Sequence, residues 1–180
     1  AECERLGGLI EDLYQLSLAD VGALEYRFEQ VDLGEIVHDA LDLSHRACES
    51  AGLALEGETE PIAIRGDARR LAQLVANLLA NARRYTDAPG RIRVVAQPTR
   101  DGARLVVEDT APGVPPDALP RLFDRLYRVE ASRSRAAGGA GLGLAICRAI
   151  VQAHGGRIDA TPSPLGGLRI VVDLPRGEGA

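Results

Sequence analysis

Two asparagines lie one helical turn apart in the segment Gln73–Thr86, at positions Asn77 and Asn81. Residues four apart on a helix share a face, so both amides would project from the same side. An amide carbonyl is a neutral hard oxygen, which suits a Mg²⁺ ion that keeps water and phosphate ligands. Arg84 could reach a phosphate and Tyr85 offers a ring face to a base. The polar stripe of this helix consists of Gln73, Asn77, Asn81 and Arg84. Taken alone, it also fits an ordinary solvated face. A separate apolar stripe, expected to cover a sheet, consists of Leu71, Leu74, Val75, Leu78, Leu79 and Ala82.

A second candidate is Asp109, which ends the apolar strand Leu105–Asp109. A carboxylate there can accept a hydrogen bond from the exocyclic amine of adenine. The following Pro112 and Gly113 turn the chain, so that the backbone passes close to the base. Taken alone, an ordinary turn at the end of a strand fits equally well.

A third candidate is the glycine run Gly139–Gly143, with glycines at positions 139, 141 and 143, at the start of a predicted helix. Glycines let the backbone approach phosphates, and a helix N-terminus favours an anion. A flexible linker is disfavoured, because the helix follows at once. The preceding basic stretch holds Arg121, Arg125, Arg128, Arg133 and Arg135, of which one or two are expected to meet phosphate or an acidic partner surface.

The absence of lysine excludes several other nucleotide and cofactor sites, since all 21 basic residues are arginine. A P-loop needs a lysine at the phosphates, a kinase of the eukaryotic type needs one on a strand, and pyridoxal phosphate needs its amine. The spacing of the glycines also fails the dinucleotide-binding fingerprint, because Leu144 or Ile146 stands where its third glycine belongs.

The composition is that of a globular domain of 180 residues with a net charge of −5, which disfavours nucleic acid as a partner. No apolar run approaches the ~20 residues that span a bilayer. The sequence contains no methionine, which suggests a fragment of a longer protein. Its three cysteines, Cys3, Cys48 and Cys147, lack metal-ligand spacing and are expected to be reduced, two of them packed on helices.

Hydrophobic periodicity and capping residues predict an α/β two-layer sandwich. Asp32 and Asp67 are expected to cap helices to about Ala51 and Tyr85. The predicted helices are 2–19, 32–51, 68–85 and 143–154, and the predicted strands are 53–56, 62–65, 91–98, 104–109, 157–161 and 167–174. Residues 110–140 are predicted to form a long loop, of the kind that often serves as a lid.

The order and spacing of these motifs over residues 31–175 resemble the catalytic, ATP-binding domain of bacterial two-component sensor histidine kinases, closest to BaeS-like envelope-stress sensors. That domain belongs to a wider group with gyrase, Hsp90 and the mismatch-repair ATPases. Asn77–Thr86 matches the family's N box, Asp109–Gly113 its first glycine box, Leu122–Arg128 its F box and Gly139–Ile146 its second glycine box. In the first glycine box, alanine replaces the usual first glycine.

The resemblance implies a mixed, mostly antiparallel sheet with three helices. Residues 1–22 would be the C-terminal part of the second dimerisation helix, and residues 31–176 the catalytic domain, with its lid at about 110–140. By the same resemblance Asn81 is the Mg²⁺ ligand, and Asn77 and Arg128 are the catalytic residues. The implied ATP-binding residues are Asn77, Asn81, Arg84, Tyr85, Asp109, Gly113, Phe123, Tyr127, Arg128, Gly139, Gly141, Leu142, Gly143 and Leu144.

The implied activity is transfer of the γ-phosphoryl group of Mg-ATP to a histidine, for relay to an aspartate of a response regulator. The acceptor box is missing: His38 is not followed by the basic residue and proline of the family motif, and His45 and His154 are expected to be structural or solvated. The acceptor therefore lies on a dimerisation domain outside this chain. The resemblance implies a cytoplasmic domain of an inner-membrane sensor, without membrane contact of its own.

Two alternatives remain. One is a nucleotide-gated interaction module, in which ATP orders the lid without catalysis. The other is a hydrolase of the gyrase or mismatch-repair type. Those ATPases carry a glutamate four residues before the metal-binding asparagine to activate water. Asn77 occupies that position here and cannot take a proton, so transfer to an external nucleophile is favoured.

Overall fold

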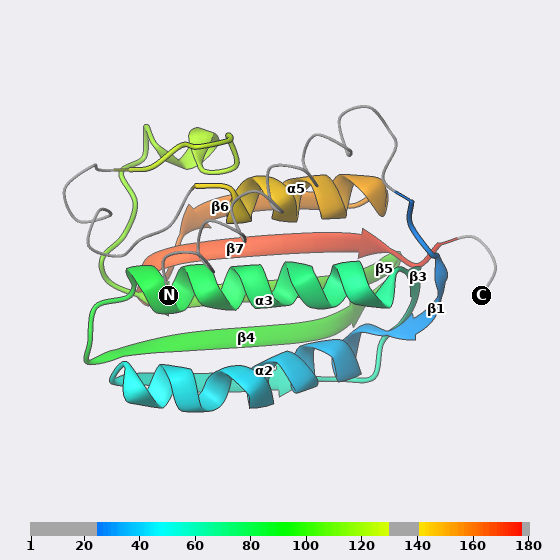
Figure 1. Ribbon diagram of the computed structural model, residues 1–180, viewed down its shortest axis with the longest axis horizontal. Helices are drawn as coiled ribbons and strands as arrows, with labels where there is room; N and C mark the ends of the chain where they lie inside the picture. Colours follow the sequence, from blue (N-terminus) through cyan, green and yellow to red (C-terminus); the bar gives the residue numbers. More distant parts are fainter. Residues whose placement is uncertain (1–24, 130–140, 178–180) are drawn as a thin grey trace, which may run out of the picture.

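The computed structural model describes residues 25–129 and 141–177 (Figure 1). Helix α2 (Leu33–Ser50) begins after Asp32, whose Oδ1 accepts hydrogen bonds from the backbone N–H groups of Gly34 and Ile62, at 2.8 and 2.9 Å. Helix α3 (Ala68–Tyr85) begins after Asp67, which accepts from Arg70 N–H at 3.0 Å. Both predicted caps are confirmed, and Asp32 also fixes the strand that precedes α3.

Five strands form one sheet in the order β2-β4-β5-β7-β6. Only β2 and β4 pair in parallel, so the sheet is mixed and mostly antiparallel, as predicted. The bounds are β2 Leu53–Thr59, β4 Gly90–Thr99, β5 Gly102–Thr110, β6 Arg157–Pro162 and β7 Gly166–Pro175. The third described helix, α5, spans Gly143–Ala153, and a short 3₁₀ helix spans Leu119–Arg121.

A second, two-stranded sheet joins β1 (Glu29–Asp32) to β3 (Ala63–Gly66) in antiparallel register. The pairing of β3 was not predicted, and β1 was missed altogether. Its four residues include a single apolar side chain, Val31, so no alternating pattern marks it as a strand. The partner β3 is about thirty residues away in the chain, so this pairing is a tertiary contact that local sequence does not report.

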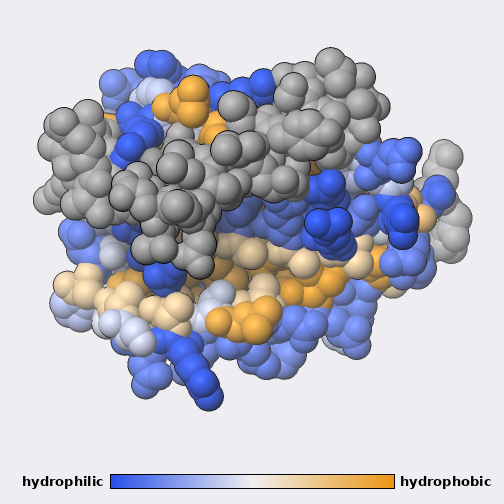
Figure 2. Space-filling model, viewed as in Figure 1, coloured by the Kyte–Doolittle hydropathy of each residue, from blue (hydrophilic) through white to orange (hydrophobic). Residues whose placement is uncertain are grey.

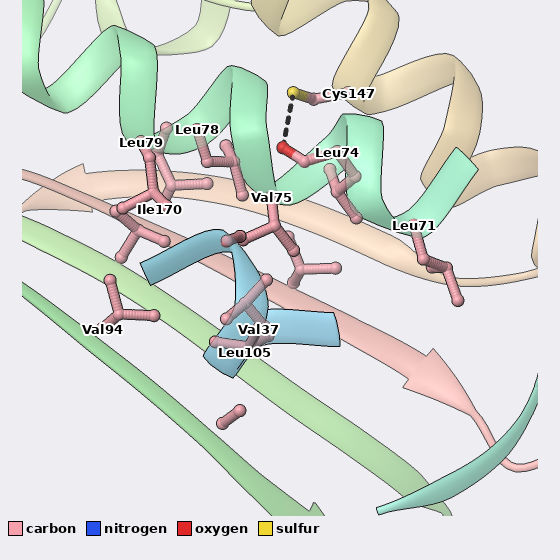
Figure 3. Close-up of a cluster of buried hydrophobic side chains, with 14 of the residues drawn as sticks. Val37, Leu71, Leu74, Val75, Leu78, Leu79, Val94, Leu105, Cys147 and Ile170 are labelled. Carbon is pink, nitrogen blue, oxygen red and sulfur yellow. Dashed lines mark hydrogen bonds between the residues drawn. The ribbon is translucent and has the colours of Figure 1, made fainter. Parts of the chain in front are cut away.

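The helices cover one face of the five-stranded sheet, which gives the predicted two layers (Figure 1). Six apolar residues of α3 face the sheet: Leu71, Leu74, Val75, Leu78, Leu79 and Ala82. Figure 3 shows several of them above Val94, Leu105 and Ile170 of the sheet. On α5, the Sγ of Cys147 lies 3.8 Å from Leu74 O. This buried face orients α3, so that its polar stripe lies beside the contact with the sheet.

The other face of the sheet carries paired charges instead of helices. Arg104 makes two hydrogen bonds to the Asp173 carboxylate, at 2.7 and 3.0 Å. Glu108 lies almost buried between Arg93 and Arg169, with each guanidinium nitrogen 3.8 Å from a carboxylate oxygen. Glu108 thus places a second carboxylate beside Asp109 in the same strand.

On the face drawn in Figure 2, hydrophilic residues predominate and the apolar ones gather in a band along α2 and α3. One large apolar side chain of α2, Leu43, is 84% exposed. Among the helices that the structure describes, none is both long and apolar enough to cross a bilayer. The predicted helix 2–19 and the 1–22 assignment lie outside the described residues.

The chain enters the described part at the right-hand end of Figure 1, where α5 ends and α3 begins. Phe28 packs on His154, with ring centroids 5.0 Å apart, and Tyr26 meets the same imidazole edge-on at 5.7 Å. The backbone N–H of Arg27 donates to Asp67 Oδ2 at 2.9 Å. Residues 25–28 are therefore anchored to the ends of two helices.

His154 connects those two helices. Its Nε2 accepts a hydrogen bond from Asp67 N–H at 3.0 Å, and its Nδ1 lies 2.8 Å from Ile150 O, so the pairing needs a proton on Nδ1 only. Burial lowers the pKa of His154, against the opposing effects of the Ile150 carbonyl and the Asp67 carboxylate. The histidine is a buried structural residue, one of the two roles expected for it.

His154→Ala is expected to lower the free energy of unfolding at pH 8 by about 1–3 kcal/mol, since it leaves the buried Asp67 N–H without an acceptor. Because the folded-state pKa lies below the ordinary 6.5, the histidine contributes stability above pH 6.5 that is lost as the pH falls below it. The difference in free energy of unfolding between wild type and the variant should therefore decrease towards pH 5, as measured by urea unfolding. His45→Ala, at an exposed position of α2, is the matched control. A difference that is constant from pH 8 to pH 5 would contradict this role.

Candidate nucleotide site

Four segments that carry the predicted motifs meet at the left-hand end of Figure 1. They are the C-terminal half of α3, the end of β5, the segment 111–129 and the start of α5. The motifs are far apart in the chain, and the sheet topology brings them together because β5 runs antiparallel to β4, back towards the end of α3. The fold therefore gathers the chemistry that the sequence predicted into one region.

The polar stripe of α3 lies beside its buried face. Asn77 and Asn81 are both half-buried, and among the described residues no hydrogen bond occupies either amide. Their carbonyl oxygens are therefore available as hard ligands, and this donor set fits Mg²⁺. Arg84 and Tyr85 follow at the end of the helix and are exposed, with 40% of Tyr85 accessible. Within the described part of the chain, no hydrogen bond or ion pair holds these two at the predicted site.

Two hydrogen bonds join the segment after α3 to the end of β5. The N–H of Asp87, two residues after α3, donates to Ala111 O at 3.1 Å. The N–H of Arg91, in β4, donates to the side-chain Oγ1 of Thr110, the last residue of β5, at 3.0 Å. The segment that follows the N box is therefore bonded to Thr110 and Ala111 of the first glycine box.

Asp109 is 6% exposed and points to the helix side of the sheet, as do Leu105 and Val107 in the same strand. Its Oδ1 accepts a hydrogen bond from Leu168 N–H at 2.8 Å. Burial raises the pKa of Asp109 to about 6, the Leu168 hydrogen bond lowers it, and Glu108 raises it further. Near pH 7 the group is mostly a carboxylate and can accept a second hydrogen bond, through Oδ2.

The turn after Asp109 lies against the β6–β7 hairpin. Gly113 is exposed, and a Cβ at this position would lie 3.2 Å from Gly166 O. The closeness of the hairpin was not predicted from the sequence. The only signal for it was the pair Gly166-Gly167 at the start of the last strand.

The F box folds as a series of turns anchored by Phe123, which is 7% exposed. The Tyr127 ring lies under the Arg121 guanidinium, 4.2 Å from its carbon to the ring centroid. Leu126 has φ 59°, a left-handed conformation that is rare for a leucine, and its N–H donates to Gly141 O at 3.0 Å. The half-buried Arg128 completes the segment.

Gly141 is a position where glycine is needed. Its φ is +72°, and a Cβ would lie 2.9 Å from Tyr127 O. The first described residues of the second glycine box thus pack directly on the backbone of the F box. Gly139, the predicted first glycine of this box, lies outside the described residues.

Helix α5 starts beside this contact. Leu142 is buried and anchors the start of the helix, and Leu144 is half-buried. A Cβ on Gly143 would meet nothing within 4 Å among the described atoms. Arg148 of α5 lies 3.7 Å from the Asp124 carboxylate, which holds the helix to the F box. No described side chain caps the first turn of α5, so its N–H groups and helix dipole can receive an anion.

The chain that carries this candidate site is similar to known proteins. Residues 66–178 match the family described as "Histidine kinase-, DNA gyrase B-, and HSP90-like ATPase". The chain is 47% identical over 176 residues to the signal transduction histidine-protein kinase BaeS of Escherichia coli K12, and the match covers 97% of this chain and 38% of BaeS. It thus spans well under half of that relative.

Two solved structures share the fold. The mycobacterial sensor histidine kinase MprB matches with a TM-score of 0.72 and 30% identity, over 83% of this chain and 97% of that one. Full-length ShkA in complex with AMPPNP matches with a TM-score of 0.83 and 28% identity, over 97% of this chain and 36% of that one. The chain belongs to the family of histidine kinase-, gyrase B- and HSP90-like ATPases.

Proposed function

We propose that this chain is the catalytic domain of a sensor histidine kinase, which binds Mg-ATP and donates its γ-phosphoryl group to a histidine on a separate dimerisation domain. The observation that carries the proposal is the hydrogen bond from Asp87 N–H, two residues after α3, to Ala111 O, directly after β5. It supports a single site in which the helix that carries the two asparagines ends beside the strand that carries Asp109.

Each of the candidate residues is assigned to one part of the nucleotide. Asp109 Oδ2 accepts from the 6-amino group of adenine, with Tyr85 beside the base. Asn81 would hold Mg²⁺, with Asn77 beside it near the metal and the phosphates, and the bound ion would neutralise phosphate charge. Arg84, Arg128 and the N–H groups at the start of α5 receive phosphate oxygens. The resemblance to sensor histidine kinases, the chemistry of these residues and the common location of their segments support these roles.

The transfer step needs an external nucleophile. An imidazole nitrogen of the acceptor attacks the γ-phosphorus, the bond from that phosphorus to the β–γ bridging oxygen breaks, and ADP leaves. Hydrolysis needs a base for water, and the amide of Asn77 cannot accept a proton. An ATPase of the gyrase type is therefore disfavoured. A nucleotide-gated module would use the same phosphate-binding residues, so phosphoryl transfer is the property that distinguishes it from the kinase. The relay would end on a response regulator, at the cytoplasmic face of the parent sensor.

Mixing the purified chain with a dimerisation domain that carries the acceptor histidine tests the proposal. With labelled Mg-ATP, the chain alone should remain unlabelled and release phosphate very slowly. The mixture should yield an acid-labile, base-stable phosphate on the dimerisation domain. Brisk phosphate release by the chain alone would favour the hydrolase, and nucleotide binding without any transfer to acceptor domains from similar kinases would favour the gated module.

A further inference from the structure

The pairing of β5 with β7 is interrupted at Asp109. Glu108 pairs with Arg169 and Thr110 pairs with Gly166, so the register shifts between these two positions. At the shift, Leu168 N–H donates to the Asp109 side chain, at 2.8 Å from Oδ1. The last strand therefore supplies a hydrogen-bond donor that holds the carboxylate.

Gly167, the residue before this donor, fits against Asp109 only because it has no side chain. A Cβ there would overlap Asp109 Oδ1 and Thr110 O, and would lie 2.6 Å from Asp109 O. Gly167 is not one of the glycines with positive φ, so its backbone conformation is open to alanine. The glycine is required for close approach and not for its torsion angles.

We propose that Gly167 is a positioning residue for base recognition, which lets Leu168 N–H hold Asp109 Oδ1 so that Oδ2 faces the 6-amino group of adenine. The inference rests on the proposed function and extends it to base selectivity. A carboxylate in this orientation accepts from an amine and repels the carbonyl oxygen that a 6-oxopurine presents at the same place. Gly167 touches neither base nor phosphate; it acts through Asp109.

Gly167→Ala tests this with two probes, ADP and inosine diphosphate, which differ in the amine and the oxo group at position 6. Wild type should prefer ADP by roughly ten- to a hundredfold. The variant should lose most of that preference through weaker ADP binding, while its affinity for inosine diphosphate changes by less than about threefold. Calorimetry with Mg²⁺ present measures both.

Gly57→Ala in β2 is the matched control. It also adds a methyl group to a strand glycine, but the nearest atoms to that methyl group belong to the flexible Leu41 side chain and not to backbone. The control should keep the wild-type preference for ADP. A further experiment compares the double variant Gly167→Ala/Asp109→Asn with Asp109→Asn alone. The two should have the same base selectivity, because Gly167 acts through Asp109.

A measurement on the unsubstituted chain covers the case in which Gly167→Ala fails to fold. The Leu168 amide proton should titrate with the Asp109 carboxyl, and it should stay protected from exchange when ADP binds, because the base takes the other oxygen. Loss of that protection with ADP would overturn the proposal, as would a folded Gly167→Ala variant that keeps its selectivity. Failure of wild type to bind any nucleotide would instead refute the proposed function.

Discussion

Asn81→Ala is expected to lower phosphoryl transfer to an added dimerisation domain by at least about a hundredfold. A Mg²⁺ ion contributes several kcal/mol of charge stabilisation to such transfer, and each 1.36 kcal/mol is about tenfold in rate. Asn81 lies on the accessible stripe of α3, outside the six residues that face the sheet, so the variant should retain its fold. The measurement is the rate of phosphohistidine formation over a range of Mg²⁺ concentrations.

Two further substitutions test whether the loss of transfer is specific to an oxygen ligand at position 81. Asn81→Asp keeps a hard oxygen at the same position and should retain Mg²⁺-dependent transfer far better than alanine. Gln152→Ala removes an exposed amide near the other end of α5 and should have no effect. Equal rates for Asn81→Ala and wild type at low Mg²⁺ would rule out Asn81 as the metal ligand.

Asp109→Asn is expected to weaken ADP binding roughly ten- to a hundredfold. The amide N–H of the new side chain would face the 6-amino group of adenine, and leaving that amine without an acceptor costs about 1–3 kcal/mol of binding free energy. The asparagine carbonyl can still accept from Leu168 N–H, so its amide nitrogen would occupy the place of Oδ2. The substitution preserves shape, replaces one acceptor oxygen by a donor and removes the negative charge of the carboxylate. Calorimetry with ADP and with a non-hydrolysable ATP analogue measures the loss.

The pH dependence separates this effect from misfolding. Because the pKa of Asp109 is raised to about 6, wild-type affinity for ADP should fall as the pH drops below 6, whereas the asparagine variant should show no such step. A folded-state pKa above the ordinary 3.8 also means that this carboxyl contributes stability at low pH that is lost as the pH rises through 6. Without nucleotide at pH 7, the variant should therefore melt at a higher temperature than wild type. Weaker binding together with a lower melting temperature would indicate structural damage instead.

Features set by local sequence were predicted correctly. Asp67 caps α3 and the six residues that face the sheet are those of the apolar stripe, because capping and helical periodicity act within a few residues. Asp109 was selected because a carboxylate at the end of the strand Leu105–Asp109 can accept from the amine of adenine, and this role stays a prediction. In contrast, β1 has no alternating pattern, and its partner lies far along the chain.

The hydrogen bond from Leu168 N–H in β7 to the Asp109 carboxylate could not be predicted in the same way. The donor is a backbone N–H, 59 residues from its acceptor, and a backbone donor is present whatever the side chain is. Only the absence of a side chain at Gly167 leaves a trace in the sequence, and a glycine near the start of a strand is equally typical of a turn or a bulge. The aromatic contacts of Tyr26 and Phe28 with His154 are likewise products of the fold.

The anchoring of residues 25–28 beside His154 has a mechanical consequence. This contact lies where α3 begins, whereas Asn81 and the start of α5 lie towards the opposite end of the molecule (Figure 1). Eighteen residues of helix span about 27 Å. Because α3 is packed on the sheet, it can turn only together with the domain, and a rotation of the domain by about 20° about this anchor would carry the far end of α3 about 9 Å along an arc. Under the proposed function, the angle at this anchor would therefore set the distance between the phosphate-binding end and the acceptor histidine.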